Sequence, residues 1–193
     1  VGIHQLGGHG LFLSSDDIQL GRGETIEDTA KVLSRYVDGI MIRTYDQQDV
    51  VDLARFSNIP IINGLTDSYH PCQILADLLT IYEAKGRLSN LKLAYIGDGN
   101  NVANSLIIGC TKVGMDIAIG CPIGYEPNDQ IIAMGIENSK LSDCRITVTN
   151  SPIEAIKYAD IVYTDVWASM GQEEEEDIRH KAFSPYQVNA ELF

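Results

Sequence analysis

The chain has 193 residues, 45% of them hydrophobic and 21% charged, a composition typical of a globular protein with one large or two small domains. Its net charge of −13 argues against nucleic acid and against an anionic membrane surface as partners, although local arginines and helix N-termini could still bind an anionic substrate. No apolar run is long enough to cross a bilayer and no signal peptide is visible, so we expect a cytoplasmic protein.

Short β-rich runs alternate with helical patterns along the whole chain. Strands are predicted at residues 9–13, 39–43, 59–63, 91–96, 116–120, 145–149 and 161–164. Helices are predicted at residues 26–36, 48–56, 71–85, 101–113, 129–137, 152–158 and 173–183. This alternation indicates an α/β fold with parallel sheets covered by helices on both faces.

The long helix that ends at Gly86 divides the alternation into two parts. We therefore expect two doubly wound parallel-sheet domains, residues 1–86 and 87–193, joined by the linking helix at 71–86. Val1 is not a start methionine, and residues 186–193 stop without a closing element. We expect both domains to be incomplete and the chain to be a segment of a longer protein.

His70-Pro71-Cys72-Gln73 opens this long helix. Pro71 suits the first helical position, and Asp67 and Ser68 are candidate caps. The apolar residues that follow at helical spacing predict one buried face: Ile74, Leu75, Leu78, Leu79 and Tyr82. His70 and Gln73 then lie beside free backbone N–H groups at the positive end of a helix, a place that favours phosphate. The alternative is an ordinary capped helix start with a surface histidine.

Further polar residues follow the predicted strands, where ligands bind in doubly wound sheets. They include Arg43, the segment 63–66, Asn101 and Asp165, so a site between the two domains is expected. The planar guanidinium of Arg43 suits phosphate or carboxylate, or an ion pair with Asp46 or Asp49. Asp165 could hold a substrate ammonium.

The turn Gly97-Asp98-Gly99-Asn100-Asn101 invites a dinucleotide interpretation, since it follows a strand and opens a helix. Val102 stands where a third glycine is needed, however, and Cys121-Pro122 stands where an acidic ribose ligand is needed. The two asparagines fit better as amides that hold a small polar ligand or simply cap the helix. A nucleotide-dependent oxidoreductase remains an alternative.

Two remaining groups of residues have simple explanations. The acidic run 173–176 fits the first turn of a helix, where the dipole favours negative charge. The four cysteines lack metal or disulfide spacing and are interpreted as reduced thiols, and the histidines likewise suggest no metal site.

Together these motifs resemble ornithine carbamoyltransferase, of the aspartate/ornithine carbamoyltransferase family. The resemblance rests on His-Pro-x-Gln at 70–73, the turn at 97–101 and Asp165-x-x-x-Ser169-Met170-Gly171. The runs at 17–33, 42–45 and 186–189 are similar too, so it covers essentially the whole chain. His-Pro-x-Gln is shared with aspartate carbamoyltransferase, whereas the Ser-Met-Gly loop with its aspartate indicates ornithine.

The resemblance implies transfer of a carbamoyl group from carbamoyl phosphate to the δ-amine of L-ornithine, as in arginine biosynthesis, without metal or cofactor. It implies that Arg43 and His70 are catalytic and polarise the carbonyl oxygen. The implied carbamoyl phosphate ligands are Gln19, Arg43, His70, Pro71, Cys72 and Gln73, from the first domain. The implied ornithine ligands are Asn101, Asp165, Ser169 and Met170, from the second. Family members are trimers or multiples of trimers.

Two family motifs are absent from these residues: Ser-Thr-Arg-Thr-Arg, expected before Val1, and His-Cys-Leu-Pro, expected after Phe193. The first supplies charge-assisted hydrogen bonds to phosphate, so we expect the isolated 193-residue segment to be inactive. A truncated relative that binds ligand without chemistry is the remaining alternative.

Overall fold

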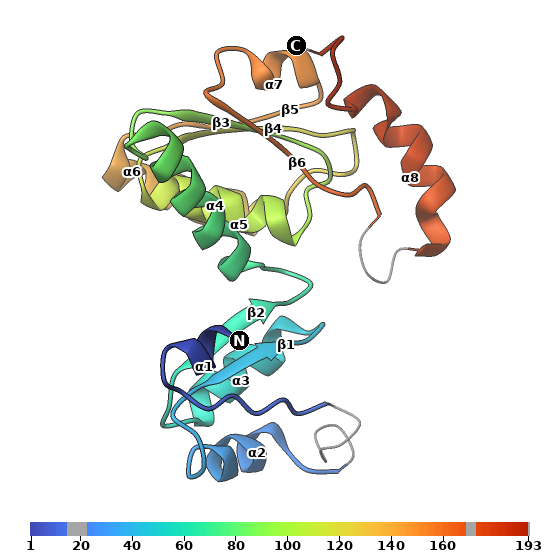
Figure 1. Cartoon of the computed structure of the whole chain (residues 1–193). Coiled ribbons are helices and arrows are strands. Elements are labelled where there is room, and N and C mark those ends of the chain that lie inside the picture. Colours follow the sequence, from blue (N-terminus) through green and yellow to red (C-terminus); the bar gives the residue numbers. More distant parts are fainter. Residues whose placement is uncertain (15–22, 169–172, 193) are drawn as a thin grey trace. The chain divides into compact units, whose positions relative to one another are not determined.

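The computed structural model describes residues 1–14, 23–168 and 173–192. Two compact units are present, the first made of Val1–Ile42 and Gln47–Ile62 and the second of Arg43–Asp46 and Asn63–Phe193. Between residues 26 and 164, helices alternate with strands (Figure 1).

The first unit contains the helices α1 (Gly2–Gln5), α2 (Ile26–Leu33) and α3 (Gln47–Phe56). Thr25 caps α2, since its hydroxyl accepts a hydrogen bond from the Asp28 N–H at 3.1 Å. Ala30 on α2 and Leu53 on α3 are buried where the two helices pack together. The strand β1 (Ile40–Arg43) pairs with β2 (Ile61–Leu65) in a two-stranded sheet.

The strand predicted at residues 9–13 is wrong. This segment has no regular structure, and Leu11 and Phe12 are 67% and 92% exposed. A short apolar run forms a strand only where a neighbouring strand takes up its backbone groups and at least one of its faces is covered. Neither condition is met at 9–13 among the described residues.

The second unit is built on a parallel four-stranded sheet with the order β5-β4-β3-β6. Its strands are β3 (Lys92–Ile96), β4 (Asp116–Gly120), β5 (Ile146–Thr149) and β6 (Ile161–Thr164). The helices α4 (Pro71–Lys85), α5 (Asn101–Lys112) and α6 (Asp129–Ser142) lie on one face, and α7 (Pro152–Ile156) lies on the other (Figure 1). The doubly wound arrangement expected for the second half of the chain is confirmed.

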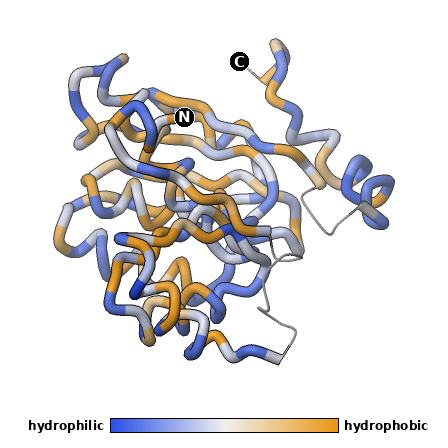
Figure 2. Tube along the Cα trace, turned by 60° about the horizontal axis from the view of Figure 1, so that its bottom comes forward, coloured by the Kyte–Doolittle hydropathy of each residue, from blue (hydrophilic) through white to orange (hydrophobic). Residues whose placement is uncertain are grey.

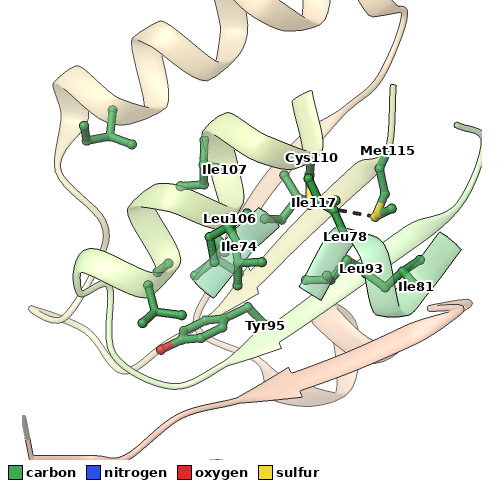
Figure 3. Close-up of a cluster of buried hydrophobic side chains, with 14 of the residues drawn as sticks. Ile74, Leu78, Ile81, Leu93, Tyr95, Leu106, Ile107, Cys110, Met115 and Ile117 are labelled. Carbon is green, nitrogen blue, oxygen red and sulfur yellow. Dashed lines mark hydrogen bonds between the residues drawn. The ribbon is translucent and has the colours of Figure 1, made fainter. Parts of the chain in front are cut away.

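Alternate side chains of the strands supply the two cores of this unit. Leu93 and Tyr95 of β3 point into the larger cluster beneath α4 and α5, whereas Ile96 belongs to the smaller cluster beside α7. Figure 3 shows how α4 contributes Ile74 and Leu78 to the larger cluster.

The apolar face predicted for α4 is only partly correct. Ile74, Leu78 and Ile81 are buried, but Leu75, Leu79 and Tyr82 are 68%, 58% and 54% exposed. Gly86 ends α4 in a left-handed conformation with φ +70°, as the sequence predicts.

The C-terminal part of the chain contains η1 (Glu173–Glu175), α8 (Glu176–Phe183) and η2 (Ser184–Tyr186), so the helix predicted at 173–183 begins as a 3-10 turn. In the described ranges, no helix is both long and apolar enough to span a membrane. Hydrophilic residues interrupt the hydrophobic ones along the described trace (Figure 2).

Candidate active site

The start of α4 is the first component of the site. Thr66, which is fully buried, closes a tight turn: its hydroxyl accepts from the Tyr69 N–H at 3.0 Å, and its own N–H donates to the Tyr69 carbonyl at 2.8 Å. The expected caps Asp67 and Ser68 are wrong, because His70 occupies the N-cap position and no side chain caps the helix there. The hydroxyl of Ser68 instead donates to the carboxylate of Asp67 at 2.9 Å. Pro71 takes the first helical position, as expected.

Hydrogen bonds made by α5 side chains join the first turns of α5 to the segment before α4. The His70 backbone N–H donates to the Ser105 hydroxyl at 2.8 Å, and this hydroxyl donates to the Asn101 carbonyl at 2.8 Å. The buried Asn101 amide donates to the Thr66 carbonyl at 2.7 Å. Residues predicted to bind different substrates, His70 and Asn101, are therefore joined through one hydroxyl.

Asn100 caps α5, one of the two roles considered for the asparagine pair, and also contacts Asp165. Its side-chain oxygen accepts from the N–H groups of Val102 and Ala103 at 3.0 and 3.1 Å, so it caps α5. Its amide nitrogen donates to the Asp165 carboxylate at 3.1 Å. Asp165 directly follows β6, the neighbour of β3 in the sheet, so the carboxyl ends of two adjacent strands bring the pair together.

Burial and three nearby charges determine the pKa of His70. Burial lowers the pKa of His70, and the positive charge of Arg43 lowers it further. The negative charges of Asp165 and Asp77 oppose this but do not reverse it. His70 is therefore neutral at pH 7, and its buried Nδ1 has no hydrogen-bond partner among the described residues.

The first turns of α4 carry two further predicted ligands. The Cys72 thiol donates to the Asn63 carbonyl at 3.3 Å. The Gln73 amide donates to the Asp77 carboxylate at 2.9 Å, one turn further along the helix. All four cysteines are free thiols, and burial raises the pKa of Cys110 and of Cys121 to about 12, so these two are inert at neutral pH.

Gly99, in the turn at 97–101, packs against the protein's own backbone instead of leaving room for a dinucleotide. A Cβ on Gly99 would lie 2.3 Å from the backbone nitrogen of Pro127, and the Gly99 N–H donates to the Tyr125 carbonyl at 2.8 Å. Gly99 thus allows a close approach of the chain to itself. Asp98 in the same turn forms a buried ion pair with Arg179 at 2.7 Å.

Gln19, Ser169 and Met170 lie outside the described residues. Sequence reasoning missed Ser105 and Arg179, because their partners lie 35 and 81 positions away. Only the hydroxyl at Ser105, one helical turn after Asn101, offered a local signal.

Family models match nearly the whole chain. Residues 1–83 match the carbamoyl-P binding domain of aspartate/ornithine carbamoyltransferase, and residues 89–193 match its Asp/Orn binding domain. The nucleotide-dependent oxidoreductase considered above finds no support in these matches.

Individual relatives agree with the family models. The chain is 59% identical to an ornithine carbamoyltransferase of Caldicellulosiruptor saccharolyticus over 192 residues, which cover 100% of this chain and 62% of that protein. It is 60% identical to one of Bacillus subtilis, again over all of this chain and 60% of that protein. Among solved structures, ornithine carbamoyltransferase from Pyrococcus furiosus is 53% identical and superimposes with a TM-score of 0.94. The match covers 98% of this chain and 61% of the Pyrococcus chain.

The chain spans about 60% of the length of the curated relatives that it matches. Both halves match the corresponding domains of a single family, in the same order along the chain. The chain belongs to the aspartate/ornithine carbamoyltransferase family.

Proposed function

We propose that the protein transfers the carbamoyl group of carbamoyl phosphate to the δ-amine of L-ornithine, giving L-citrulline and phosphate. The observation that carries this is the convergence of His70, Asn101 and Asp165 at the adjoining ends of α4, α5 and β6 in one compact unit. The high identity to ornithine carbamoyltransferases over the whole chain supports ornithine rather than aspartate as acceptor.

In this proposal the neutral δ-amine attacks the carbonyl carbon of carbamoyl phosphate. The carbonyl oxygen becomes an oxyanion, which an N–H of neutral His70 and the guanidinium of Arg43 stabilise. The carbonyl then re-forms as the bond from carbon to the phosphate oxygen breaks. Phosphate leaves with the bonding electrons and takes up the proton that the nitrogen loses. No covalent enzyme intermediate is required, so the residues act by positioning and electrostatics.

The proposed ligands divide between the two substrates. Gln19, Arg43, His70, Pro71, Cys72 and Gln73 bind carbamoyl phosphate, with the first N–H groups of α4 facing the phosphate. Asn101, Asp165, Ser169 and Met170 bind ornithine. The boundary between a carbamoyl phosphate domain at 1–86 and an ornithine domain at 87–193 belongs to the same proposal, and the ranges of the two family matches support it.

Three further properties complete the proposal: a role in arginine biosynthesis, a cytoplasmic location, and assembly as a homotrimer or a multiple of trimers. Light scattering of the purified protein would report a mass that is a multiple of three chains. A monomer or dimer at working concentrations would contradict this assembly.

The direct test is an assay of citrulline and phosphate formation by the protein expressed from its complete gene. Carbamoyl phosphate is supplied with ornithine, putrescine, N-acetylornithine or aspartate in turn, and we expect rapid turnover with ornithine. His70→Gln should lower kcat about a hundredfold. Asp165→Asn should raise the KM for ornithine and leave the KM for carbamoyl phosphate nearly unchanged. Binding of both substrates without turnover would instead favour the non-catalytic alternative.

A further inference from the structure

Asp77 lies one helical turn after Gln73 on α4, and its carboxylate contacts the Gln73 side chain. Its Oδ1 accepts a hydrogen bond from Gln73 Nε2 at 2.9 Å in a partly buried position. Burial is the largest cause of the raised pKa of Tyr163, and the negative charge of Asp77 is the second. The same charge opposes the lowering of the pKa of His70. Asp77 therefore contacts Gln73 directly and lies close enough to His70 to influence its pKa, although nothing in the sequence marked it.

We propose that Asp77 is a positioning residue that fixes the orientation of the Gln73 amide and thereby selects a carbamoyl group over an acetyl group. This inference rests on the proposed function, in which Gln73 binds carbamoyl phosphate.

The chemical reason is that an ionised carboxylate only accepts hydrogen bonds. The two ends of a glutamine amide are almost identical in shape, so packing alone distinguishes them poorly. Against Asp77, only the nitrogen end of Gln73 forms a hydrogen bond. The oxygen end is then directed away from Asp77, as an acceptor for a ligand.

This orientation matters because the carbamoyl group carries an NH2 with two donors, whereas an acetyl group carries a methyl with none. The Gln73 oxygen pairs with the carbamoyl NH2 but is left without a partner by acetyl phosphate. A site built to hydrogen-bond a ligand NH rejects an analogue that lacks it. With the amide reversed, a donor would face a donor, and the preference for carbamoyl would fall.

A helix-stabilising role is the competing explanation, and the chain supplies a matched control. On α3, Gln48 Nε2 donates to Asp52 Oδ1 at 3.0 Å with the same spacing of four residues, in an exposed position. Asp52→Asn removes the same type of pair as Asp77→Asn without touching the proposed site.

The experiment measures steady-state kinetics of the complete protein, with acetyl phosphate as a competitive inhibitor. We expect Asp77→Asn to lower kcat/KM for carbamoyl phosphate about tenfold. The preference for carbamoyl over acetyl phosphate, measured as the inhibition constant of acetyl phosphate divided by the KM for carbamoyl phosphate, should fall by a similar factor. The KM for ornithine should stay within twofold. Asp77→Glu, which keeps the acceptor, should recover most of the preference, and Asp52→Asn should match the unmodified protein.

A double variant keeps the test decisive if Asp77→Asn folds poorly. Gln73→Glu/Asp77→Asn exchanges donor and acceptor without changing the total charge, because the amide now lies at position 77 and the carboxylate at position 73. The carboxylate at position 73 can still accept from the carbamoyl NH2. We therefore expect the preference for carbamoyl over acetyl phosphate to recover in part. Equal losses for carbamoyl and acetyl phosphate, or no change in Asp77→Asn, would overturn the inference. Absence of citrulline formation in the unmodified protein would instead overturn the proposed function, so the two failures are distinguishable.

Discussion

The Nη1 atom of Arg179 lies 2.7 Å from the carboxylate of Asp98, and both side chains are about 90% buried, with 8% and 11% exposure. The same Nη1 also donates to the Trp167 carbonyl at 3.2 Å. This guanidinium thus ties α8 both to the turn after β3 and to the segment after β6, which carries Asp165. Burial raises the pKa of the Asp98 carboxyl, and Arg179 offsets this only in part, so the pair bears a desolvation cost.

Breaking this pair should therefore destabilise the protein strongly. We expect Arg179→Met to lower the free energy of unfolding by about 3 kcal/mol, because a buried carboxylate is left without its cation. The double variant Asp98→Leu/Arg179→Met should recover part of the loss, since it leaves no buried charge. Urea unfolding followed by circular dichroism measures both effects.

An exposed ion pair provides the control. Arg145 contacts Asp116 at 3.3 Å with its side chain 87% exposed, so Arg145→Met should change the unfolding free energy by less than about 1 kcal/mol. Equal effects of the two arginine substitutions would show that the Asp98–Arg179 pair contributes no more than a surface contact.

Asn100 is expected to orient Asp165 as well as cap α5. Asn100→Asp keeps an oxygen for the N–H groups of Val102 and Ala103 but replaces the donor to Asp165 with a second negative charge. We expect stability to change by less than about 1 kcal/mol and the KM for ornithine to rise about tenfold, which corresponds to about 1.4 kcal/mol. Substrate kinetics and thermal unfolding separate the two effects.

Asn128→Asp is the matched control, because Asn128 caps α6 by accepting from the Gln130 N–H at 2.8 Å. It should leave the ornithine KM unchanged. A similar rise in both variants would mean that Asn100 acts only through helix capping.

The features that were predictable from sequence are those with local causes. The strands Asp116–Gly120 and Ile161–Thr164 match their predicted bounds, and α4 ends at Gly86 as expected. Buried apolar runs and a left-handed glycine are visible in a short window of sequence. The strand predicted at 9–13 failed because strand formation depends on a neighbour that a local pattern does not contain.

The sequence predicted which residues are candidates for the site, but not the hydrogen bonds that join them. His70, Asn101 and Asp165 stood out because they follow strands or open helices. The hydrogen bonds by which the Ser105 hydroxyl joins two of them could not be predicted, because a serine inside a helix normally bonds only its own backbone. Its bond to the His70 N–H exists only once α4 and α5 pack together.

The pKa of His70 should depend on Arg43. Burial is the larger cause of the lowered pKa, and the charge of Arg43 is the second. Arg43→Gln should therefore raise the pKa of His70 toward 6.5 without restoring it fully. An NMR titration of the imidazole in the complete protein measures the shift. Arg87→Gln removes an equal charge beyond the far end of α4, about 20 Å along the helix, and should leave the pKa unchanged.

The same lowered pKa predicts how stability responds to acid. As the pH falls through 6.5, the unfolded chain binds a proton at His70 before the folded protein does, so the folded state loses stability. His70→Gln should weaken this loss between pH 6.5 and the lower folded pKa. An unchanged acid dependence in His70→Gln would contradict the lowered pKa.

Gly99 lies where the turn at 97–101 packs closely against residues 126 and 127. A Cβ at Gly99 would meet the backbone of Glu126 and Pro127 at 2.3–2.7 Å, and backbone cannot move aside as a flexible side chain can. We expect Gly99→Ala to lower the unfolding free energy by about 3 kcal/mol or more. Gly39→Ala is the control, because its Cβ would meet only the Pro60 carbonyl oxygen at 3.5 Å, an ordinary contact. If the turn instead held a dinucleotide, Gly99→Ala would fold normally and abolish NAD binding. We expect the unmodified protein to show no NAD binding in a fluorescence titration, because the glycine accommodates the protein's own backbone.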